Sequence, residues 1–345
     1  MMFAKLSKKS ALKRILVVSL TNIGDVVLTC PVIDILCNDF PEAQIDVVIG
    51  PKAASLLEGN PNLRINVFDK QATLAEKVAW FLDLYKTNYD LVVDLRQTAI
   101  ALFLGARYAT PVFLKEIATS PLASRHDIKG MHKKEVHINR LRRVYDFDTL
   151  SEDKKAILTT TEDEHFFKNE VAPFLQGANF VVIAPGAADS AKRWHAKGFA
   201  TVADHLSATQ KIIFVGDDKD AVIINDIQRQ MKSLTLSLAG KVNLRQLAFL
   251  LKQCSWALTH DSGVMHLASY FNVPLVVLWG PTDIQKYAPW SKRSVIVRRN
   301  ENCQRCLDPK SEVIHNCMSF IEVNDVIKAS TRLSEVDHEY NNKLS

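Results

Sequence analysis

The stretch Arg14-Ile-Leu-Val-Val-Ser-Leu-Thr-Asn-Ile-Gly-Asp25 decides the fold class. Its first half is a continuous apolar run rich in β-branched residues, which is typical of a strand buried on both faces of a parallel sheet. A segment with the apolar spacing of a helix follows, from Val26 to Cys37. A buried strand that passes through a short loop into a helix is the first half of a β-α-β unit.

The alternation of strand and helix patterns continues through most of the chain. In the first half we expect strands at residues 44–49, 65–68 and 89–95, and helices at 52–58, 74–85 and 136–144. After residue 175 we expect strands at residues 180–184, 211–215, 234–239, 255–259 and 274–279, and helices at 199–208, 221–231, 244–253 and 263–271. This order predicts an α/β protein with parallel sheets.

The length of 345 residues suggests two domains, at roughly 150 residues per domain. We expect two doubly wound α/β domains in tandem, at residues 1–170 and 171–330, and a C-terminal tail or helix at residues 331–345. Ligands of such sheets bind beyond the carboxyl ends of the strands. The loops at those ends are therefore the first places to look for function.

The composition is that of an ordinary globular chain, with 47% hydrophobic and 23% charged residues. It excludes a disordered chain, which lacks the apolar surface needed to offset the entropy of ordering. No apolar run reaches the ~20 residues of a spanning helix, and the basic N-terminus lacks the apolar core and cleavage site of a secretory signal. Six cysteines are too few for a disulfide scaffold. We therefore expect a cytoplasmic protein.

The net charge of +5 is modest, but basic residues gather between Ser124 and Arg143, where seven Lys or Arg and three His accompany two acids. This segment is either a solvated surface or a surface that attracts an anion, such as a phosphorylated substrate, a membrane or a nucleic acid. Nucleic acid is the least favoured partner, because neither a recognition motif nor interleaved aromatic residues accompany the charge.

The first candidate loop, residues 19–25, contains one glycine and not the Gly-x-Gly-x-x-Gly pattern of a dinucleotide-binding turn. This disfavours a nicotinamide or flavin cofactor. Asp25 stands where the next helix is expected to begin, and it has two interpretations. It is either a helix cap, or a carboxylate at the carboxyl edge of a strand that acts as a general base.

Two loops in the second half are candidates for anion binding. Residues 184–199 form a connection longer than the roughly 2–6 residues typical between strand and helix, and its Lys192 can neutralise a phosphate. In residues 259–266, Asp261 and Ser262 are placed to cap a helix whose first turn Gly263 leaves open, a site suited to a diphosphate. His266 either donates to that anion or is structural.

Two other groups have ambiguous patterns. Asp217-Asp-Lys-Asp220 has a carboxylate spacing seen at metal sites, but it also opens a helix, where acids are favourable without a metal, so we assign no metal there. Four soft ligands gather near the end of the chain: Cys303, Cys306, His315 and Cys317. They are a small zinc site, reduced structural thiols or a redox pair, and their spacing leaves all three open.

Several motifs together resemble glycosyltransferase family 9, the lipopolysaccharide heptosyltransferases. They are Asn22-Ile-Gly-Asp25-Val-Val-Leu-Thr-x-Pro31, Tyr89-Asp-Leu-Val-Val-Asp-Leu95, Pro185-Gly-x5-Lys192-Arg-Trp194, Leu238-Ala-Gly-Lys-Val-Asn-Leu244, Asp261-Ser-Gly-x-x-His266 and Leu278-Trp-Gly-Pro-Thr-Asp283. The motifs occur in the family's order, and the resemblance extends over about residues 14 to 330.

The resemblance implies a GT-B fold, in which two Rossmann-like domains bind the acceptor and the nucleotide-sugar donor respectively. It implies that a heptose is transferred from ADP-heptose to the inner core of lipopolysaccharide, with inversion and without a metal or other cofactor. The expected place is the cytoplasmic face of the inner membrane, where the basic segment meets an anionic acceptor and contacts the membrane surface.

The resemblance also implies roles for individual residues. Asp25 corresponds to the base that deprotonates the acceptor, Lys192 stabilises the departing diphosphate, and Asp261 holds heptose hydroxyls. The full set expected to bind the donor is Asn22, Gly24, Pro185, Gly186, Lys192, Val242, Asp261, Ser262, Gly263 and His266. The residues expected to bind the acceptor are Arg96, Lys133, Lys134 and Arg140.

Three rival functions remain open from the sequence. They are a glycosyltransferase of the same fold that uses another nucleotide sugar, a nucleotide-sugar epimerase of the same architecture, and a binding protein without activity. The presence of both Asp25 and Lys192 argues against the last, and no second acid or base stands out to support an epimerase.

Overall fold

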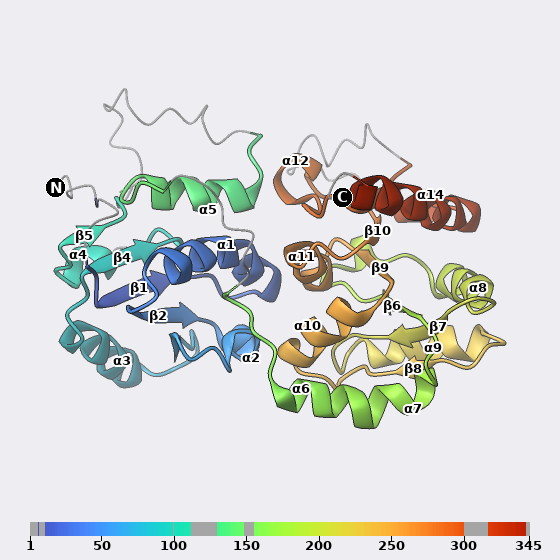
Figure 1. The fold of residues 1–345 in the computed structure, drawn as a ribbon, viewed down its shortest axis with the longest axis horizontal. Coiled ribbons are helices and arrows are strands. Elements are labelled where there is room, and N and C mark those ends of the chain that lie inside the picture. The colour runs from blue at the N-terminus through green and yellow to red at the C-terminus, as the bar shows by residue number, and fades with distance from the viewer. Residues whose placement is uncertain are drawn as a thin grey trace. The chain divides into compact units, whose positions relative to one another are not determined.

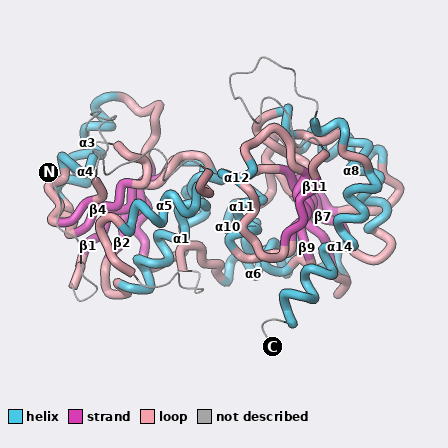
Figure 2. Tube along the Cα trace, turned by 90° about the horizontal axis from the view of Figure 1, so that it is seen from above, coloured by secondary structure: helices cyan, strands magenta, loops and turns pink. Residues whose placement is uncertain are grey.

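The computed structural model describes residue 6 and residues 11–98, 100–111, 130–147, 155–299 and 317–342. The chain divides into two compact units, Met1–Leu158 and Thr159–Ser345. Each unit is a parallel sheet flanked by helices, as Figures 1 and 2 show. The predicted fold class, α/β with two doubly wound sheets, is confirmed. Within the described residues, no helix combines the length and apolar character that crossing a membrane requires.

Among its described residues, the first unit has a five-stranded sheet in the order β3-β2-β1-β4-β5, with all strands parallel. Its strands are β1 (Arg14–Val18), β2 (Gln44–Ile49), β3 (Leu63–Val67), β4 (Leu91–Asp94) and β5 (Tyr108–Ala109). Its helices are α1 (Ile23–Asp39), the 3-10 turn η1 (Pro51–Ala53), α2 (Ala54–Leu57), α3 (Leu74–Lys86), α4 (Ile100–Phe103) and α5 (Lys133–Arg142). The short β5 was not predicted, because its two residues carry no strand pattern.

Helix α1 is apolar on all sides, and every residue from Val26 to Cys37 is buried. The sheet covers one side of it and α5 packs against it on the other (Figure 1). A helix without a polar face must be covered on all sides. The one carboxylate in this buried stretch, Asp34, accepts the backbone N–H groups of Lys155 and Ala156 at 2.8 and 2.7 Å, which fastens the end of the unit onto α1.

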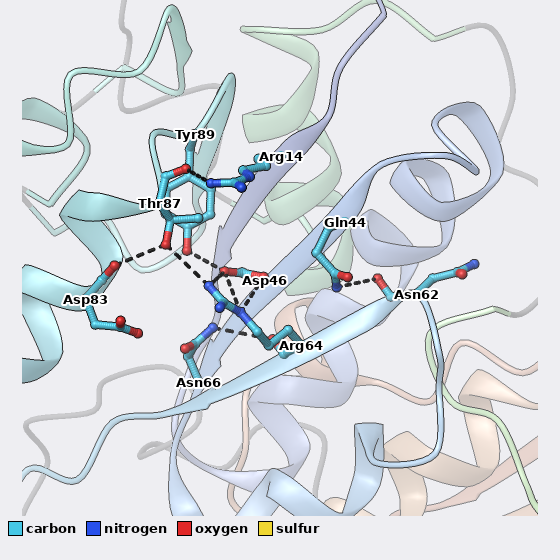
Figure 3. Close-up of polar contacts among 9 residues, drawn as sticks. All are labelled: Arg14, Gln44, Asp46, Asn62, Arg64, Asn66, Asp83, Thr87 and Tyr89. Atoms are coloured by element: carbon cyan, nitrogen blue, oxygen red, sulfur yellow. Dashed lines mark hydrogen bonds and ion pairs between the residues drawn. The ribbon is translucent and has the colours of Figure 1, made fainter.

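A buried carboxylate on β2 joins three segments of the first unit (Figure 3). Asp46 accepts hydrogen bonds from the guanidinium of Arg64 on β3 and from the Tyr89 hydroxyl, the latter at 2.5 Å. Burial, reinforced by the hydrogen bond to Asp46, raises the pKa of Tyr89, so the phenol stays protonated and donates. The cluster ties β2 to β3 and to the segment that enters β4.

In the part of the second unit that the structure describes, the sheet has six parallel strands in the order β11-β10-β9-β6-β7-β8. The strands are β6 (Phe180–Ala184), β7 (Lys211–Phe214), β8 (Leu236–Ser237), β9 (Trp256–His260), β10 (Leu275–Leu278) and β11 (Ser294–Val297). The helices are α6 (Thr161–Phe166), the π-helical η3 (Phe167–Val171), α7 (Ala172–Leu175), the 3-10 turn η4 (Ser190–Lys192), α8 (Ala196–Leu206), α9 (Ala221–Gln230), α10 (Leu244–Gln253), α11 (Gly263–Tyr270), α12 (Ile284–Tyr287), the 3-10 turn η5 (Cys317–Phe320) and α14 (Val323–Asn342).

The division between the units comes earlier than the expected boundary at 170/171. Helices α6 and η3 pack against α10, and the Arg245 guanidinium on α10 donates through Nε to both oxygens of Asp163, at 3.0 and 2.8 Å. Because Asp163 is fully buried, this pair commits α6 to the second unit. At the other end, α14 is one helix that runs across the expected boundary at 330/331 and packs against α8, β10 and β11.

The strand orders define one special position in each sheet. In both units the first strand lies between the second and the fourth, so the direction of winding reverses between β1 and β4 and between β6 and β9. Open α/β sheets bind ligands beyond the carboxyl ends of the strands at such a switch point. The loops that follow β1, β4, β6 and β9 are therefore the structural candidates for a site.

The Arg245–Asp163 pair provides a test of this packing. Arg245→Met leaves a buried carboxylate without its cation, which we expect to lower the free energy of unfolding of the second unit by about 3–5 kcal/mol. The matched control is Arg229→Met, which removes an exposed partner 3.8 Å from Asp226 and costs less than about 1 kcal/mol. Urea denaturation followed by tryptophan fluorescence measures both, because four of the five tryptophans lie in this unit. Equal losses in the two variants would contradict the expectation.

Candidate functional site

The loop after β1 places Asp25 at the start of α1. The helix begins at Ile23, so the cap position belongs to Asn22 and not to Asp25. The Asn22 side chain makes no hydrogen bond to the helix backbone. Instead its Nδ2 donates to Asp25 Oδ2 at 3.0 Å. Asp25 and the neighbouring Gly24 are partly buried. The Asp25 carboxylate is thus held by a side chain and positioned in the first helical turn, where the helix dipole favours a negative charge.

The loop after β4 lies beside the loop after β1, because Asp94 pairs with Val18 in the sheet. Asp94 is buried and accepts hydrogen bonds from the Arg96 backbone N–H at 3.0 Å and from Thr98 Oγ1 at 2.8 Å. Burial raises the pKa of Asp94, although these hydrogen bonds oppose the shift. Gln97 takes a left-handed conformation, with φ of +59°. The loop is therefore a tight turn built around Asp94, and it carries Arg96 at this edge.

Helix α5 contributes basic side chains to the same edge. Arg140 donates through Nη1 to the backbone oxygen of Leu95, so two of the expected acceptor residues, Arg96 and Arg140, come together at one loop. His137, one turn earlier on the helix, is buried, and burial together with the nearby Arg140 lowers its pKa to about 3.

Lys133 and Lys134 lie farther away, in the first turn of α5, where Lys134 pairs with Glu135 at 3.2 Å. The beginning of the basic segment, residues 124–129, lies outside the described part of the chain.

In the second unit, the long loop after β6 has internal structure of its own. Asp189 accepts the N–H of Ala191 at 2.9 Å, and Arg193 Nε donates to the Ala187 oxygen at 2.8 Å. These contacts hold the 3-10 turn that ends at Lys192. The preceding Pro185 and Gly186 are buried at the end of the strand.

The loops after β6 and β9 meet at an ion pair. Lys192 Nζ lies 2.6 Å from Asp261 Oδ2, and Asp261 Oδ1 lies 4.0 Å from His266 Nε2. The His266 ring stacks on Trp290, with centroids 5.5 Å apart and planes at 24°. Lys192, from the loop after β6, therefore forms one cluster with Asp261 and His266, from the segment after β9, at the switch point of the second sheet. Trp290 was missed by the sequence reasoning, because it lies in an irregular segment without a motif.

Helix α11 opens beside this cluster. Ser262 occupies its cap position, but the Ser262 hydroxyl lies 3.1 Å from Thr259 Oγ1 and makes no hydrogen bond to the helix backbone. The helix begins at Gly263. The first backbone N–H groups of a helix have no partner within the helix, so they are available to an anion.

Asp220 lies in the turn to which the sequence pattern assigned a helix start and no ligand. The turn at residues 217–220 does open α9, since Asp217 Oδ1 accepts the N–H groups of Lys219 and Asp220 at 2.9 and 3.0 Å. The Asp220 carboxylate, however, occupies the space that a side chain on Gly186 would fill. Burial raises the pKa of Asp220, although the hydrogen bond from the Asp217 backbone N–H opposes the shift. A carboxylate therefore lies directly against the start of the Lys192 loop.

Two other expected sites are less defined. Val242 is partly buried and follows Gly240, whose φ of +67° lies in the left-handed region. Of the four soft ligands, Cys317 is buried at the start of η5, whereas Cys303, Cys306 and His315 lie outside the described residues. Among the described residues, no three His, Cys, Asp or Glu side chains are grouped so as to hold a metal ion.

Comparisons with known proteins identify the family. The model of "Glycosyltransferase family 9 (heptosyltransferase)" matches residues 79–315. Lipopolysaccharide heptosyltransferase 3 of Escherichia coli is 26% identical, over 90% of this chain and 96% of that protein. Lipooligosaccharide heptosyltransferase 2 of Campylobacter jejuni is 24% identical, over 92% of this chain and 97% of that protein.

Solved structures share the fold. The family 9 glycosyltransferase of Veillonella parvula superposes with a TM-score of 0.75 at 24% identity, over 94% of this chain and 99% of that one. The ADP-heptose heptosyltransferase II of E. coli gives 0.73 at 21% identity, over 95% and 99%. Because the family model covers more than half of the residues, the chain belongs to glycosyltransferase family 9 and is a glycosyltransferase.

Proposed function

We propose that this glycosyltransferase moves a heptose from ADP-heptose to the inner core of lipopolysaccharide, with inversion at the anomeric carbon and without a metal. The observation that carries the proposal is the cluster of Lys192, Asp261 and His266 at the switch point of the second sheet. The relatives named above are heptosyltransferases that act on lipopolysaccharide or lipooligosaccharide, and this supports the choice of sugar and acceptor.

The donor side of the proposal lies in the second unit. Two kinds of group bind the diphosphate in the proposal. One is the ammonium of Lys192, and the other is the start of α11, with its backbone N–H groups and with Ser262, Gly263 and His266. Lys192 is held by Asp261 in the structure. In the proposal, an incoming phosphate takes over this ammonium, and Asp261 turns its freed oxygen to the hydroxyls of the sugar.

The nucleoside has its own candidates. Asp220 lies against Gly186, after the second strand of the unit. An acidic residue in the corresponding region of Rossmann-type sheets accepts hydrogen bonds from ribose hydroxyls, and we propose the same role here. Val242, on the loop after β8, contacts the base. Pro185 and Gly186, which are buried at the end of β6, complete the proposed donor site.

The reaction needs one base and one stabilised leaving group. Asp25 accepts the proton of the acceptor hydroxyl as that oxygen bonds to the anomeric carbon, and the bond from this carbon to the diphosphate breaks. The negative charge that develops on the diphosphate is stabilised by Lys192, which supplies what a metal ion supplies in other enzymes. Asn22 holds the Asp25 carboxylate in place, and we propose that Asn22 and Gly24 also bind the donor.

The acceptor side of the proposal lies in the first unit. The core of lipopolysaccharide is anionic, and the basic side chains of α5 and the β4 loop attract it. Arg96 and Arg140 stand close to the edge that carries Asp25, whereas Lys133 and Lys134 provide a wider field. We place the protein in the cytoplasm, with a peripheral contact to the inner membrane where the acceptor is anchored.

Nucleotide preference separates this proposal from a related enzyme that uses another sugar nucleotide. We expect ADP to raise the melting temperature of the protein more than UDP or GDP at equal concentration, since at equal concentration the ligand that binds more tightly stabilises the folded state more. Lys192→Met should weaken ADP binding by about 10- to 100-fold, because it removes a charge-assisted contact. Calorimetry measures the affinity. A larger shift with UDP or GDP would favour the other nucleotide sugar.

Asp25→Asn tests the base. The amide keeps the size of the side chain but cannot accept the acceptor's proton, so we expect kcat for transfer from ADP-heptose to a lipopolysaccharide core acceptor to fall by ~10²–10⁴-fold. Affinity for ADP and the melting temperature should stay near the wild-type values, because the cap position belongs to Asn22. Mass spectrometry of the acceptor follows the transfer. Near wild-type turnover in this variant would remove Asp25 from the mechanism.

The acceptor's charge is tested on the two lysines, while Arg140 is kept because it supports the Leu95 carbonyl. Lys133→Ala with Lys134→Ala should raise the KM for the acceptor and flatten its dependence on salt, since attraction at long range is screened over about 8 Å at physiological ionic strength. The KM for the donor should not change. The matched control, Lys219→Ala with Arg229→Ala, removes the same charge from the second unit. Identical acceptor kinetics in both double variants would show that α5 is only a solvated surface.

A further inference from the structure

His260 is the last residue of β9 and is completely buried. Its Nε2 accepts the backbone N–H of Trp194 at 3.0 Å, so the neutral ring carries its proton on Nδ1. Burial lowers the pKa of His260 to about 4, although an interaction with the backbone of Gly186 opposes the shift. At neutral pH the ring is therefore uncharged and remains an acceptor.

The hydrogen bond between Trp194 and His260 lies next to the Lys192–Asp261 ion pair along both segments of the chain. Trp194 lies two residues after Lys192, and His260 immediately precedes Asp261. The loop after β6 is thus attached to the end of β9 at two neighbouring points. One is the hydrogen bond between Trp194 and His260, and the other is the ion pair between Lys192 and Asp261. The hydrogen bond between Trp194 and His260 involves no group that is proposed to bind the donor. It therefore persists when a phosphate draws Lys192 away from Asp261.

The Trp194 end of the attachment is itself immobilised. The indole Nε1 donates to the Ile321 oxygen at 2.9 Å, and the ring packs edge to face on Phe199 with centroids 5.2 Å apart. Phe199 also packs edge to face on the His260 ring, at 5.3 Å. A side chain on Gly198 would collide with the Trp194 ring. The tryptophan is therefore a fixed anchor, and His260 connects it to the strand that carries Asp261.

We propose that His260 is a positioning residue that holds the loop after β6 by its Trp194 N–H, so that Lys192 stays within reach of both Asp261 and a bound diphosphate. This inference rests on the donor site proposed above. Without His260 Nε2, the buried N–H of Trp194 would have no hydrogen-bond partner. This arrangement is costly, and we expect the loop to avoid it by moving away from β9. Lys192 would move with it.

Three variants of the full-length protein test the proposal. His260→Leu removes the nitrogen that accepts the Trp194 N–H. His260→Gln places an amide oxygen near the position of Nε2, so a hydrogen-bond acceptor for this N–H is restored. The matched control is Trp256→Phe at the start of the same strand, which removes the hydrogen bond from Trp256 Nε1 to Gln210 at 3.1 Å without touching the loop. Amide hydrogen exchange at Trp194 reports on the attachment directly, and calorimetry with ADP reports on its consequence.

We expect the leucine variant to lose protection of the Trp194 amide and to bind ADP about tenfold more weakly, in line with the loss of one buried hydrogen bond. The glutamine variant should retain protection and bind ADP within about threefold of wild type. The Trp256→Phe control should lose melting temperature without losing ADP affinity, which separates positioning from general destabilisation.

The contrary outcomes are distinct. A leucine variant that keeps Trp194 protected, or that binds ADP as tightly as wild type, would overturn the proposal. A glutamine variant as impaired as the leucine variant would also overturn it, because packing and not the acceptor atom would then be responsible. Wild-type protein that binds no ADP would instead overturn the proposed donor site, while the exchange rates would still decide whether His260 holds the loop.

Discussion

Parallel strands joined by right-handed crossovers can only wind outward from a starting strand, and a sheet that grows in both directions must reverse its winding once. In this chain the reversal occurs between β1 and β4 in one unit and between β6 and β9 in the other. At these points two neighbouring loops diverge to opposite faces of the sheet, and their polar groups are left open to a ligand. The placement of Asp25 beside the Asp94 turn, and of Lys192 beside Asp261, follows from this constraint.

Much of the fold could be read from local sequence. After Arg14, the run to Leu20 has one polar residue, Ser19. The burial of this strand on both faces was therefore predictable. The unit boundary was not, because it depends on Arg245 reaching Asp163 across the packing of two helices. Patterns report the surface that a segment must bury, but they do not report which distant partner covers it.

The candidate site shows the same division. The loops with Lys192, Asp261 and His266 could be selected in advance, since strand ends, small residues and helix starts leave local signals. Their convergence into one cluster, the stacking of Trp290 on His266, and the contact of Arg140 with the Leu95 oxygen depend on tertiary structure. The roles of Asp25 and of the other site residues remain predictions that follow from chemistry and from resemblance.

The complete burial of α1 has a consequence for how this enzyme can diverge. The helix that carries Asp25 is enclosed by the sheet and by α5, so most substitutions along it disturb a packed interior. The exposed Gln97 in the turn after β4 and the outer face of α5 are not part of that packed interior. A new acceptor preference, in evolution or in a designed library, is therefore most accessible through those two segments. The helix behind them stays constant and keeps the proposed base in its place.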